Sequence, residues 1–354
     1  MVLFAAGLGL LLGGGECLVR GASRLAEAAG ISPLVIGLTV VAFGTSSPEM
    51  AVSTVSALSG NGGADIAVGN IVGSNIFNIL FILGISAMVA PLAVSAQLVK
   101  WDVPIMIGVS VLFLVLASNA RIDRIDGILL FAGIIAYTAF TVWKGRKENN
   151  AARPGEGLDA HPAGSGRGRA LLVNLLFIAA GLALLVMGSK WMVDGAVQMA
   201  KNFGVSELVI SLTIVAVGTS LPELATSVLA TFKGERDIAV GNVIGSNLFN
   251  ILCVAGFSGA VVPGGVPVSP AAIAFDIPVM IAVAAACLPI FFSGFRIDRL
   301  EGFLFLACYV AYTAWLVLTA LDHPALPGLD VALRYLVLPV TALLILIPAI
   351  RQAR

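Results

Sequence analysis

The sequence contains few charged residues, few histidines and few cysteines. Only 11% of its 354 residues are Asp, Glu, Lys or Arg, whereas about a quarter of the residues of a typical soluble protein are charged. Its mean hydropathy is +1.02. So little charge excludes an ordinary soluble domain and a disordered chain, and it indicates a protein that crosses a membrane several times.

The scarcity of histidine and cysteine limits the chemistry open to the chain. His161 and His323 both fall outside the apolar segments, so no histidine is available within the membrane as a metal ligand or a general base. The four cysteines lack the spacing of a metal site and are interpreted as packing residues rather than disulfides. No nucleotide-binding motif occurs. These absences argue against an enzyme, and no cofactor is expected.

The apolar residues form segments long enough to cross a bilayer, for which about 20 residues are needed. We predict eleven such segments, with approximate bounds 3–19, 33–57, 66–89, 101–118, 125–143, 170–193, 206–231, 238–262, 274–293, 300–319 and 331–350. The predicted fold class is therefore an all-α polytopic membrane protein.

The distribution of Lys and Arg predicts the orientation of the chain. With the N-terminus outside, fifteen of the 20 basic residues lie on one side of the membrane and five on the other. Basic residues concentrate on the cytoplasmic side. We therefore expect the polar segment 144–169 and the C-terminus in the cytoplasm, and the protein in the plasma membrane.

Two motifs occur twice in the chain. TVVAFGTSSPE at 39–49 returns as TIVAVGTSLPE at 213–223, and DIAVGNIVGSNIFNIL at 65–80 returns with three differences as DIAVGNVIGSNLFNIL at 237–252. WDVPIM matches FDIPVM, and RIDRIDG matches RIDRLEG, so the repeat extends over nearly the whole chain. Such a match indicates duplication.

The duplication predicts the organisation of the chain. Each copy holds five predicted spans, an odd number, so the second copy must cross the membrane in the opposite sense. Inverted repeats are typical of secondary transporters, whose substrate sites lie near the midplane where the copies meet. We expect ten core helices in two inverted five-helix repeats, 1–143 and 170–320, joined by a flexible cytoplasmic linker, 144–169, and followed by an eleventh, C-terminal helix within 321–354.

Each copy of the first motif places a glutamate just after a proline in an apolar segment. An ionised carboxylate at mid-membrane costs several kcal/mol unless a cation or a proton offsets it, so Glu49 and Glu223 are interpreted as functional. Pro48 and Pro222 cannot continue the helical hydrogen bonds, and each is expected to free the carbonyl four residues before it as an oxygen ligand.

Other oxygen-bearing side chains accompany the two glutamates. Hydroxyls lie within one turn of each glutamate, and the second motif places a hydroxyl and an amide four residues apart on one helical face. Hard oxygen donors suit Ca²⁺ and Na⁺ and offer nothing soft to Zn²⁺ or Cu²⁺. The candidates are Thr45, Ser46, Ser74 and Asn78 in the first copy and Thr219, Ser220, Ser246 and Asn250 in the second.

Several other polar residues have alternative roles. Small polar side chains in membrane helices often serve packing, so either packing or a role in the site is open to Ser47, Asn70, Asn75, Asn242 and Asn247. Asp102 and Asp276 stand two residues before a proline, at the start of the fourth and ninth predicted spans. This position favours helix capping over ion binding.

The repeated motifs GTSSPE with GSNIFN and GTSLPE with GSNLFN, in two five-span halves, closely resemble the α-repeats of the sodium/calcium exchanger family, part of the cation/calcium antiporter superfamily. The resemblance covers almost all of the chain except the linker and the last span. It implies an antiporter in which the second and third helices of each half build the ion sites, while the first helix of each half slides past a rigid core. Members typically have ten spans, so the eleventh is a departure.

The resemblance also implies a set of ligands. The family's pattern assigns ion ligation to both glutamates and to the eight hydroxyl and amide residues named above, and it adds the main-chain carbonyls of Ala42 and Ala216. Some relatives carry Asp at one of the amide positions, whereas Asn78 and Asn250 are both amides here. This difference leaves potassium dependence open. The implied partners are Ca²⁺, Na⁺ and the lipid bilayer, with no nucleic acid and no obligatory protein partner.

The residues alone leave the coupling ion open. A buried glutamate can bind a proton in place of Na⁺, so H⁺-coupled exchange of Ca²⁺ or of another cation is the main alternative. A passive cation channel is the alternative from another class. It is less favoured because channels usually surround their pore with several subunits or repeats.

Overall fold

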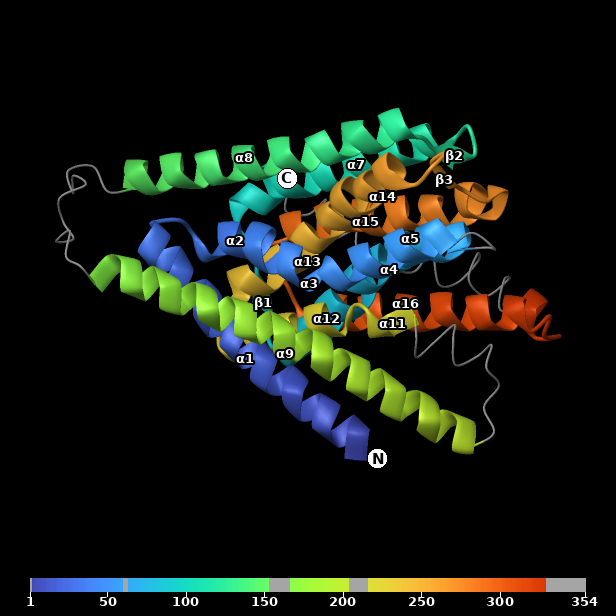
Figure 1. The fold of residues 1–354 in the computed structure, drawn as a ribbon, viewed down its shortest axis with the longest axis horizontal. Coiled ribbons are helices and arrows are strands. Elements are labelled where there is room, and N and C mark those ends of the chain that lie inside the picture. The colour runs from blue at the N-terminus through green and yellow to red at the C-terminus, as the bar shows by residue number, and fades with distance from the viewer. Residues whose placement is uncertain (1, 60–62, 153–165, 204–215, 329–354) are drawn as a thin grey trace.

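The protein is a bundle of membrane-length helices (Figure 1). The computed structural model describes residues 2–59, 63–152, 166–203 and 216–328. Within these ranges the regular structure is helical apart from four two-residue strands. The predicted all-α class is confirmed.

In the first half, short stretches of π-helix interrupt the second, third and fourth helices at Gly37–Val41, Asn78–Leu83 and Leu98–Asp102. The other elements are α1 (Val2–Ala29), α2 (Pro33–Ile36), α3 (Ala42–Thr45), α4 (Ser47–Ser59), α5 (Gly63–Phe77), α6 (Gly84–Val89), β1 (Leu92–Ala93), α7 (Val103–Ala117), β2 (Arg121–Ile122) and α8 (Arg124–Ala152).

The second half repeats this order, with π-helical stretches at Asn250–Ala255 and Ala272–Asp276. Its other elements are α9 (Gly166–Asn202), α11 (Ala216–Gly218), α12 (Leu221–Phe232), α13 (Arg236–Phe249), α14 (Gly256–Val261), β3 (Val266–Pro267), α15 (Ile277–Phe292), β4 (Arg296–Ile297) and α16 (Arg299–Ala320).

The described residues contain fewer complete spans than the eleven predicted, because two of the predicted spans lie partly or wholly outside them. Eight helices are long and apolar enough to cross a membrane, and the bent pair Pro33–Thr45 and Ser47–Ser59 makes up to nine. The span expected at 206–231 is described only from Ala216 onward. The eleventh expected span, 331–350, lies outside the described residues.

The segment between the halves contains more helix than we expected. We predicted a flexible linker over 144–169, but α8 continues to Ala152 and α9 begins at Gly166. Residues 144–152 include Lys, Arg, Glu and Ala, which favour helix. Pro154 disfavours helical geometry in the residue before it, so α8 ends close to that point.

The first helices of the two halves, α1 and α9, pack against each other in antiparallel directions. A Cβ added at Gly14 would meet the carbonyl oxygen of Gly181 at 2.8 Å, and one at Gly188 would meet that of Gly7 at 2.8 Å. Only glycine permits so close an approach of two backbones. The contacting glycines recur every seven residues, at 7, 14 and 21 on α1 and at 181, 188 and 195 on α9.

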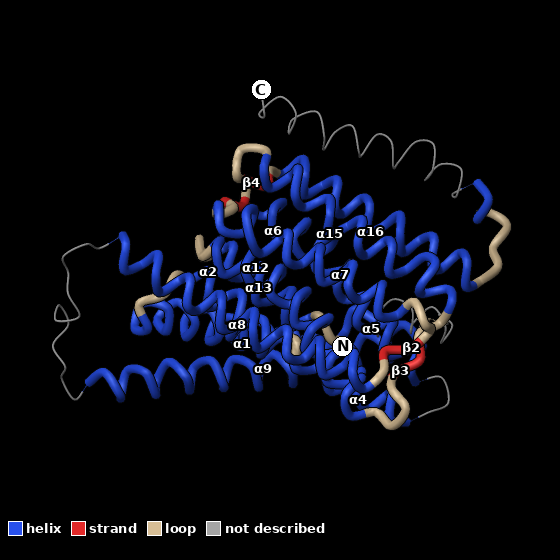
Figure 2. Tube along the Cα trace, turned by 90° about the horizontal axis from the view of Figure 1, so that it is seen from above, coloured by secondary structure: helices blue, strands red, loops and turns tan. Residues whose placement is uncertain are grey.

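The central spans are those that carry the second repeated motif. The Arg236–Val261 span is buried along its whole apolar window and the Gly63–Val89 span over most of it, whereas Arg299–Ala320 has few buried residues. Figure 2 shows α13 inside the bundle, with α1 and α9 along one edge and α16 near the opposite edge. The repeated motif therefore lies in the core, and the outer helices separate it from lipid.

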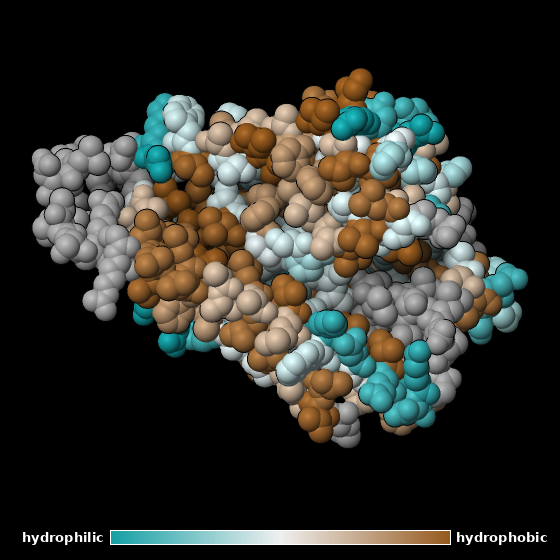
Figure 3. Space-filling model, in the orientation of Figure 1, coloured by the Kyte–Doolittle hydropathy of each residue, from teal (hydrophilic) through white to brown (hydrophobic). Residues whose placement is uncertain are grey.

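The surface has the distribution that a membrane protein requires. In Figure 3 hydrophobic residues cover much of the middle of the visible face, and hydrophilic residues gather toward its ends. Large exposed apolar side chains such as Leu172, Leu176 and Val115 lie on spans. An apolar surface of this extent would aggregate in water but is stable in a bilayer.

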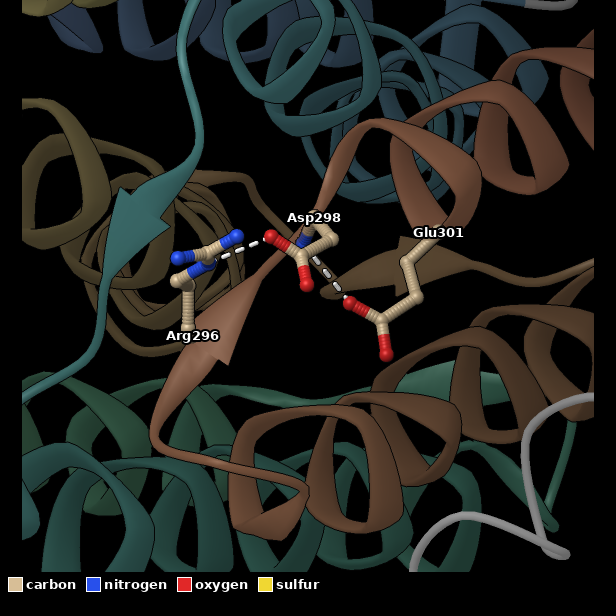
Figure 4. A network of polar contacts seen from close by, with 3 residues as sticks. All are labelled: Arg296, Asp298 and Glu301. Carbon is tan, nitrogen blue, oxygen red and sulfur yellow. Dashed lines mark hydrogen bonds and ion pairs between the residues drawn. The ribbon is translucent and has the colours of Figure 1, made fainter.

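The repeated RIDR motif starts the last helix of each half. On α16 the Glu301 carboxylate accepts the Asp298 N–H at 2.8 Å, and Arg296 forms an ion pair with Asp298 (Figure 4). On α8 the Asp126 carboxylate accepts the Asp123 N–H at 3.0 Å in the same way. These bonds satisfy donors that a helix start leaves open. The adjoining strands pair across the halves, β1 with β4 and β2 with β3.

The predicted capping role of Asp102 and Asp276 is wrong. Neither side chain makes a cap hydrogen bond, because a π-helical stretch runs directly into α7 and α15 and occupies the backbone donors there. Asp102 is instead fully buried, and its carboxylate accepts the Tyr137 hydroxyl at 2.9 Å and the Gln97 amide at 3.2 Å. This carboxylate joins the fourth span to the fifth.

The packing of α1 on α9 can be tested with two neighbouring glycines. Gly14→Ala places a methyl group against the α9 backbone, and overpacking of this kind costs about 1–3 kcal/mol. Gly13→Ala is the matched control because nothing lies within 4 Å of its Cβ position. In thermal unfolding of the purified protein in detergent, we expect Gly14→Ala alone to lower the midpoint. Equal midpoints for the two variants would contradict the proposed close approach.

Candidate cation site at the junction of the halves

The chain breaks at the position of the first repeated motif in the first half. The helix ends at Thr45, resumes at Ser47 and changes direction by 41°. Pro48 follows the break and cannot donate a backbone hydrogen bond. In the second half, Ser220 and Pro222 occupy the corresponding start of α12. Both breaks place the following glutamate on the first turn of a new helix.

The carbonyls near the breaks are already hydrogen-bonded. We expected Pro222 to free the Gly218 carbonyl as a ligand, but the Ser189 hydroxyl of α9 donates to it. The Ala42 carbonyl accepts the Ser46 N–H at 3.0 Å. Ala216 belongs to α11, and its side chain lies outside the described part of the chain. Ligation by these carbonyls therefore has less support than ligation by side chains.

Each glutamate is bonded by a serine of the other half. The Ser220 hydroxyl donates to Glu49 Oε1 at 3.0 Å, and the Ser46 hydroxyl donates to Glu223 Oε1 at 3.0 Å. Both glutamates are only 1% exposed. The site is thus closed to solvent in this structure, and neither half is complete without the other.

The predicted serines of the central helices extend this network. Ser220 also contacts the Ser74 hydroxyl at 3.1 Å, and Ser246 donates to Glu223 Oε1 at 3.5 Å. Both serines are buried. The central helices therefore line the same space as the two carboxylates.

Four oxygens at this site have no hydrogen-bond partner. Seven buried side-chain atoms of the described residues lack a partner, and four of them are Glu49 Oε2, Glu223 Oε2, Asn78 Oδ1 and Asn250 Oδ1. Leaving a buried acceptor unpaired costs about 1–3 kcal/mol, and more for a charged group. Because all four belong to predicted ligands, the arrangement is suited to a bound cation, which would satisfy them together.

Thr45 is buried and Thr219 is half-buried near the site, but both donate elsewhere. Thr45 donates to Asn242 Oδ1 and Thr219 to Asn70 Oδ1, each at 3.1 Å. Each bond crosses between the halves. Their hydroxyl oxygens retain lone pairs that could still accept a cation.

Asn70 and Asn242, whose role the sequence left open, hold the glutamate helices in place. The Asn70 amide donates to Ser53 at 2.9 Å and to the Glu49 carbonyl at 3.4 Å. Asn242 makes the equivalent bonds to Ser227 and the Glu223 carbonyl at 3.0 and 3.4 Å. The identity of DIAVGN in both copies was the only sequence signal of this role.

The Ser47 hydroxyl donates to the Phe43 carbonyl of α3 at 2.8 Å rather than to a residue of the site. Hydrogen bonds link each of the ten predicted side-chain ligands either to a glutamate of the site or to another residue that lines it. Ligation of an ion by these residues stays a prediction. The described residues contain no cluster of three or more His, Cys, Asp or Glu, so any cation here would depend mainly on neutral oxygens.

Comparison with known proteins places this geometry in a family. The family model for the sodium/calcium exchanger protein matches residues 1–143 and 173–318. The putative antiporter CaxA of Alkalimonas amylolytica is 39% identical over 86% of this chain and 95% of its own length. The sodium/calcium exchanger MaX1 of Methanosarcina acetivorans is 33% identical over 86% of this chain and 95% of its own length.

A solved structure shows the same architecture. The sodium-calcium exchanger NCX_Mj, from crystals soaked with zero Na⁺ and Ca²⁺, superposes with a TM-score of 0.74 at 30% identity, over 89% of this chain and 97% of its own. The matched regions of the family model include both halves and both copies of the glutamate motif. The chain belongs to the sodium/calcium exchanger family.

Proposed function

We propose that the protein is a secondary active antiporter that exchanges Ca²⁺ for Na⁺ by alternating access at the site between its two halves. The single observation that carries this proposal is the set of four unpartnered buried oxygens on Glu49, Glu223, Asn78 and Asn250. A cation bound among these residues would give such oxygens a partner, and hard cations such as Ca²⁺ take oxygen donors of this kind.

The charge of the site explains how the two ions would be coupled. Two carboxylates give a charge of −2, which one Ca²⁺ or two Na⁺ neutralise, while a third Na⁺ leaves +1. Because both kinds of ion require the same carboxylates, they compete, and the Na⁺ gradient can drive Ca²⁺ across the membrane without another energy source. An exchange of three Na⁺ for one Ca²⁺ responds to voltage, at about 2.3 kcal/mol per charge per 100 mV.

Alternating access requires part of the bundle to move. The glycine contacts join α1 and α9 to each other, whereas the site is held by α5, α13 and the glutamate helices. We expect α1 and α9 to move as one unit across this core. No cofactor or protein partner is needed for such a movement.

Proton-coupled exchange is the second candidate, and one observation favours it. Each buried carboxylate has one oxygen without a partner, and a proton on that oxygen would neutralise the group as Na⁺ does. The same geometry therefore fits either coupling ion.

We also propose that α8 ends in the cytoplasm and that the N-terminus and the β2–β3 end of the bundle are outside. The excess of basic residues on one side supports this orientation. The end of α8 and the β2–β3 pair lie at opposite ends of the bundle (Figure 1). We propose the plasma membrane as its setting.

The coupling ion can be identified in proteoliposomes loaded with ⁴⁵Ca²⁺. We expect an inward Na⁺ gradient at constant pH to drive Ca²⁺ efflux, and a pH gradient without Na⁺ to drive little. Potassium is varied independently as a third arm. Flux driven by the pH gradient alone would establish the proton-coupled alternative instead.

The role of the glutamates can be tested with Glu49→Gln and Glu223→Gln. Removing one buried charge that pairs with a cation costs about 3–5 kcal/mol, so Ca²⁺ flux at limiting Ca²⁺ should fall more than about 100-fold. Glu27→Gln is the matched control because Glu27 is exposed on α1. Full activity in both site variants would separate transport from this site.

The orientation can be tested with single cysteines in a background lacking the four native ones. Ser118→Cys lies at the exposed end of α7, and Gly157→Cys lies in the segment between the halves. A membrane-impermeant maleimide should label the first in intact cells and the second only after permeabilisation. The reverse pattern would invert the proposed topology.

A further inference from the structure

A second asparagine of the opposite half lies behind each predicted asparagine ligand. The Asn78 amide nitrogen donates to Asn247 Oδ1 at 3.0 Å, and the Asn250 amide nitrogen donates to Asn75 Oδ1 at 3.1 Å. All four side chains are at most 2% exposed. Each bond uses the nitrogen end of a predicted ligand and leaves its oxygen end without a partner.

The supporting asparagines are themselves oriented by methionine sulfur. The Asn247 amide nitrogen lies 3.6 Å from Met106 Sδ and 3.4 Å from the Asn75 carbonyl oxygen. The Asn75 amide nitrogen lies 3.4 Å from Met280 Sδ. A thioether can accept a hydrogen bond but cannot donate one. Facing sulfur, each supporting amide must therefore present its nitrogen to methionine and its oxygen to the predicted ligand.

We infer that Asn75 and Asn247 are positioning residues that fix the predicted ligands with their oxygens toward the cation. Two relays result, Met106–Asn247–Asn78 and Met280–Asn75–Asn250. In the second relay the direction of the hydrogen bonds follows from the Met280 sulfur, and in the first it follows from the Met106 sulfur together with the Asn75 carbonyl, which also only accepts. This inference rests on the proposed function, because it supposes that a cation occupies the site.

The orientation of an amide matters because its two ends differ in chemistry. The oxygen is a cation ligand, whereas the NH₂ group carries partial positive charge and repels one. A carboxylate would have oxygen at both ends and would need no such control, but it would add charge to a site that already holds Glu49 and Glu223. The relays allow neutral residues to ligate while the charge of the site stays at −2.

Packing alone does not account for this geometry. If the four asparagines served only to join the helices, leaving Asn78 Oδ1 and Asn250 Oδ1 unpaired would cost about 1–3 kcal/mol each with no compensating gain. A relay that ends in an unpaired oxygen is instead suited to binding a cation. The two copies repeat it with the halves exchanged, since each relay begins and ends in one half and passes through the other.

The inference can be tested by a double-mutant cycle on Ca²⁺ affinity, measured by calorimetry on the purified full-length protein in Na⁺-free buffer. Asn247→Ala removes the acceptor of the Asn78 amide, and loss of such a supporting partner typically costs about 10–100-fold in metal affinity. In an Asn78→Asp background the same substitution should cost no more than about threefold. A carboxylate presents oxygen in either orientation, so in this background the side chain at position 78 no longer depends on Asn247 for its orientation.

A second pair of variants covers the case in which Asn247→Ala does not fold. Met280→Leu conserves volume but removes the sulfur to which the Asn75 amide donates, so it should weaken Ca²⁺ binding, and Asn250→Asp should suppress the loss in this second relay. Met88→Leu is the control, because Met88 is 38% exposed on the neighbouring α6. Thermal unfolding reports any change in packing separately from binding.

The outcomes distinguish this inference from the proposed function. If the wild-type protein binds Ca²⁺ and Asn247→Ala lowers its affinity equally in both backgrounds, Asn247 acts through packing and the inference is wrong. An unchanged affinity in both Asn247→Ala and Met280→Leu also overturns it. If the wild-type protein binds no Ca²⁺ at all, the proposed cation site fails first.

Discussion

Burying two carboxylates inside an apolar helical bundle is the constraint on which the rest of the structure depends. The desolvation of each charge costs several kcal/mol, and the protein offsets only part of this cost. Serine satisfies one oxygen of each glutamate, and the other oxygen stays unpaired. A fully satisfied carboxylate would have little to gain from a cation. The incomplete bonding leaves one oxygen of each buried carboxylate unsatisfied, and the proposed cation would stabilise it.

The inverted repeat suits a second requirement of the proposed exchange, which is to present one site to both sides of a membrane. Every bond to a glutamate oxygen from the opposite half has a counterpart in the reverse direction. The two halves therefore contribute equivalent walls, and neither side of the membrane is favoured by the ligands themselves. A preference for one side of the membrane must therefore come from the outer helices. The glycine contacts between α1 and α9 keep those two helices together.

Much of this organisation could be predicted from the sequence, because duplication and membrane composition leave strong signals. The all-helical fold, the two halves and the residues gathered at their junction follow from two repeated motifs. The helical continuation of α8 to Ala152 and the role of Asp102 could not be predicted in this way. The linker was judged by its composition, and the cap at Asp102 was judged by its distance from a proline. A π-helical stretch, which no residue pattern announces, changes which donors are left open there.

The roles of the conserved-looking amides within the repeat were also beyond sequence reasoning, since Asn70, Asn75, Asn242 and Asn247 could equally have served packing. What separates the two roles is the direction of hydrogen bonds across the halves, and direction depends on tertiary partners that lie more than 140 residues away. Methionine is the least expected of these partners, because its sulfur usually fills space. Here the sulfur also accepts a hydrogen bond. An acceptor that cannot donate fixes the orientation of an amide, and through it the face that a neutral ligand presents to a cation.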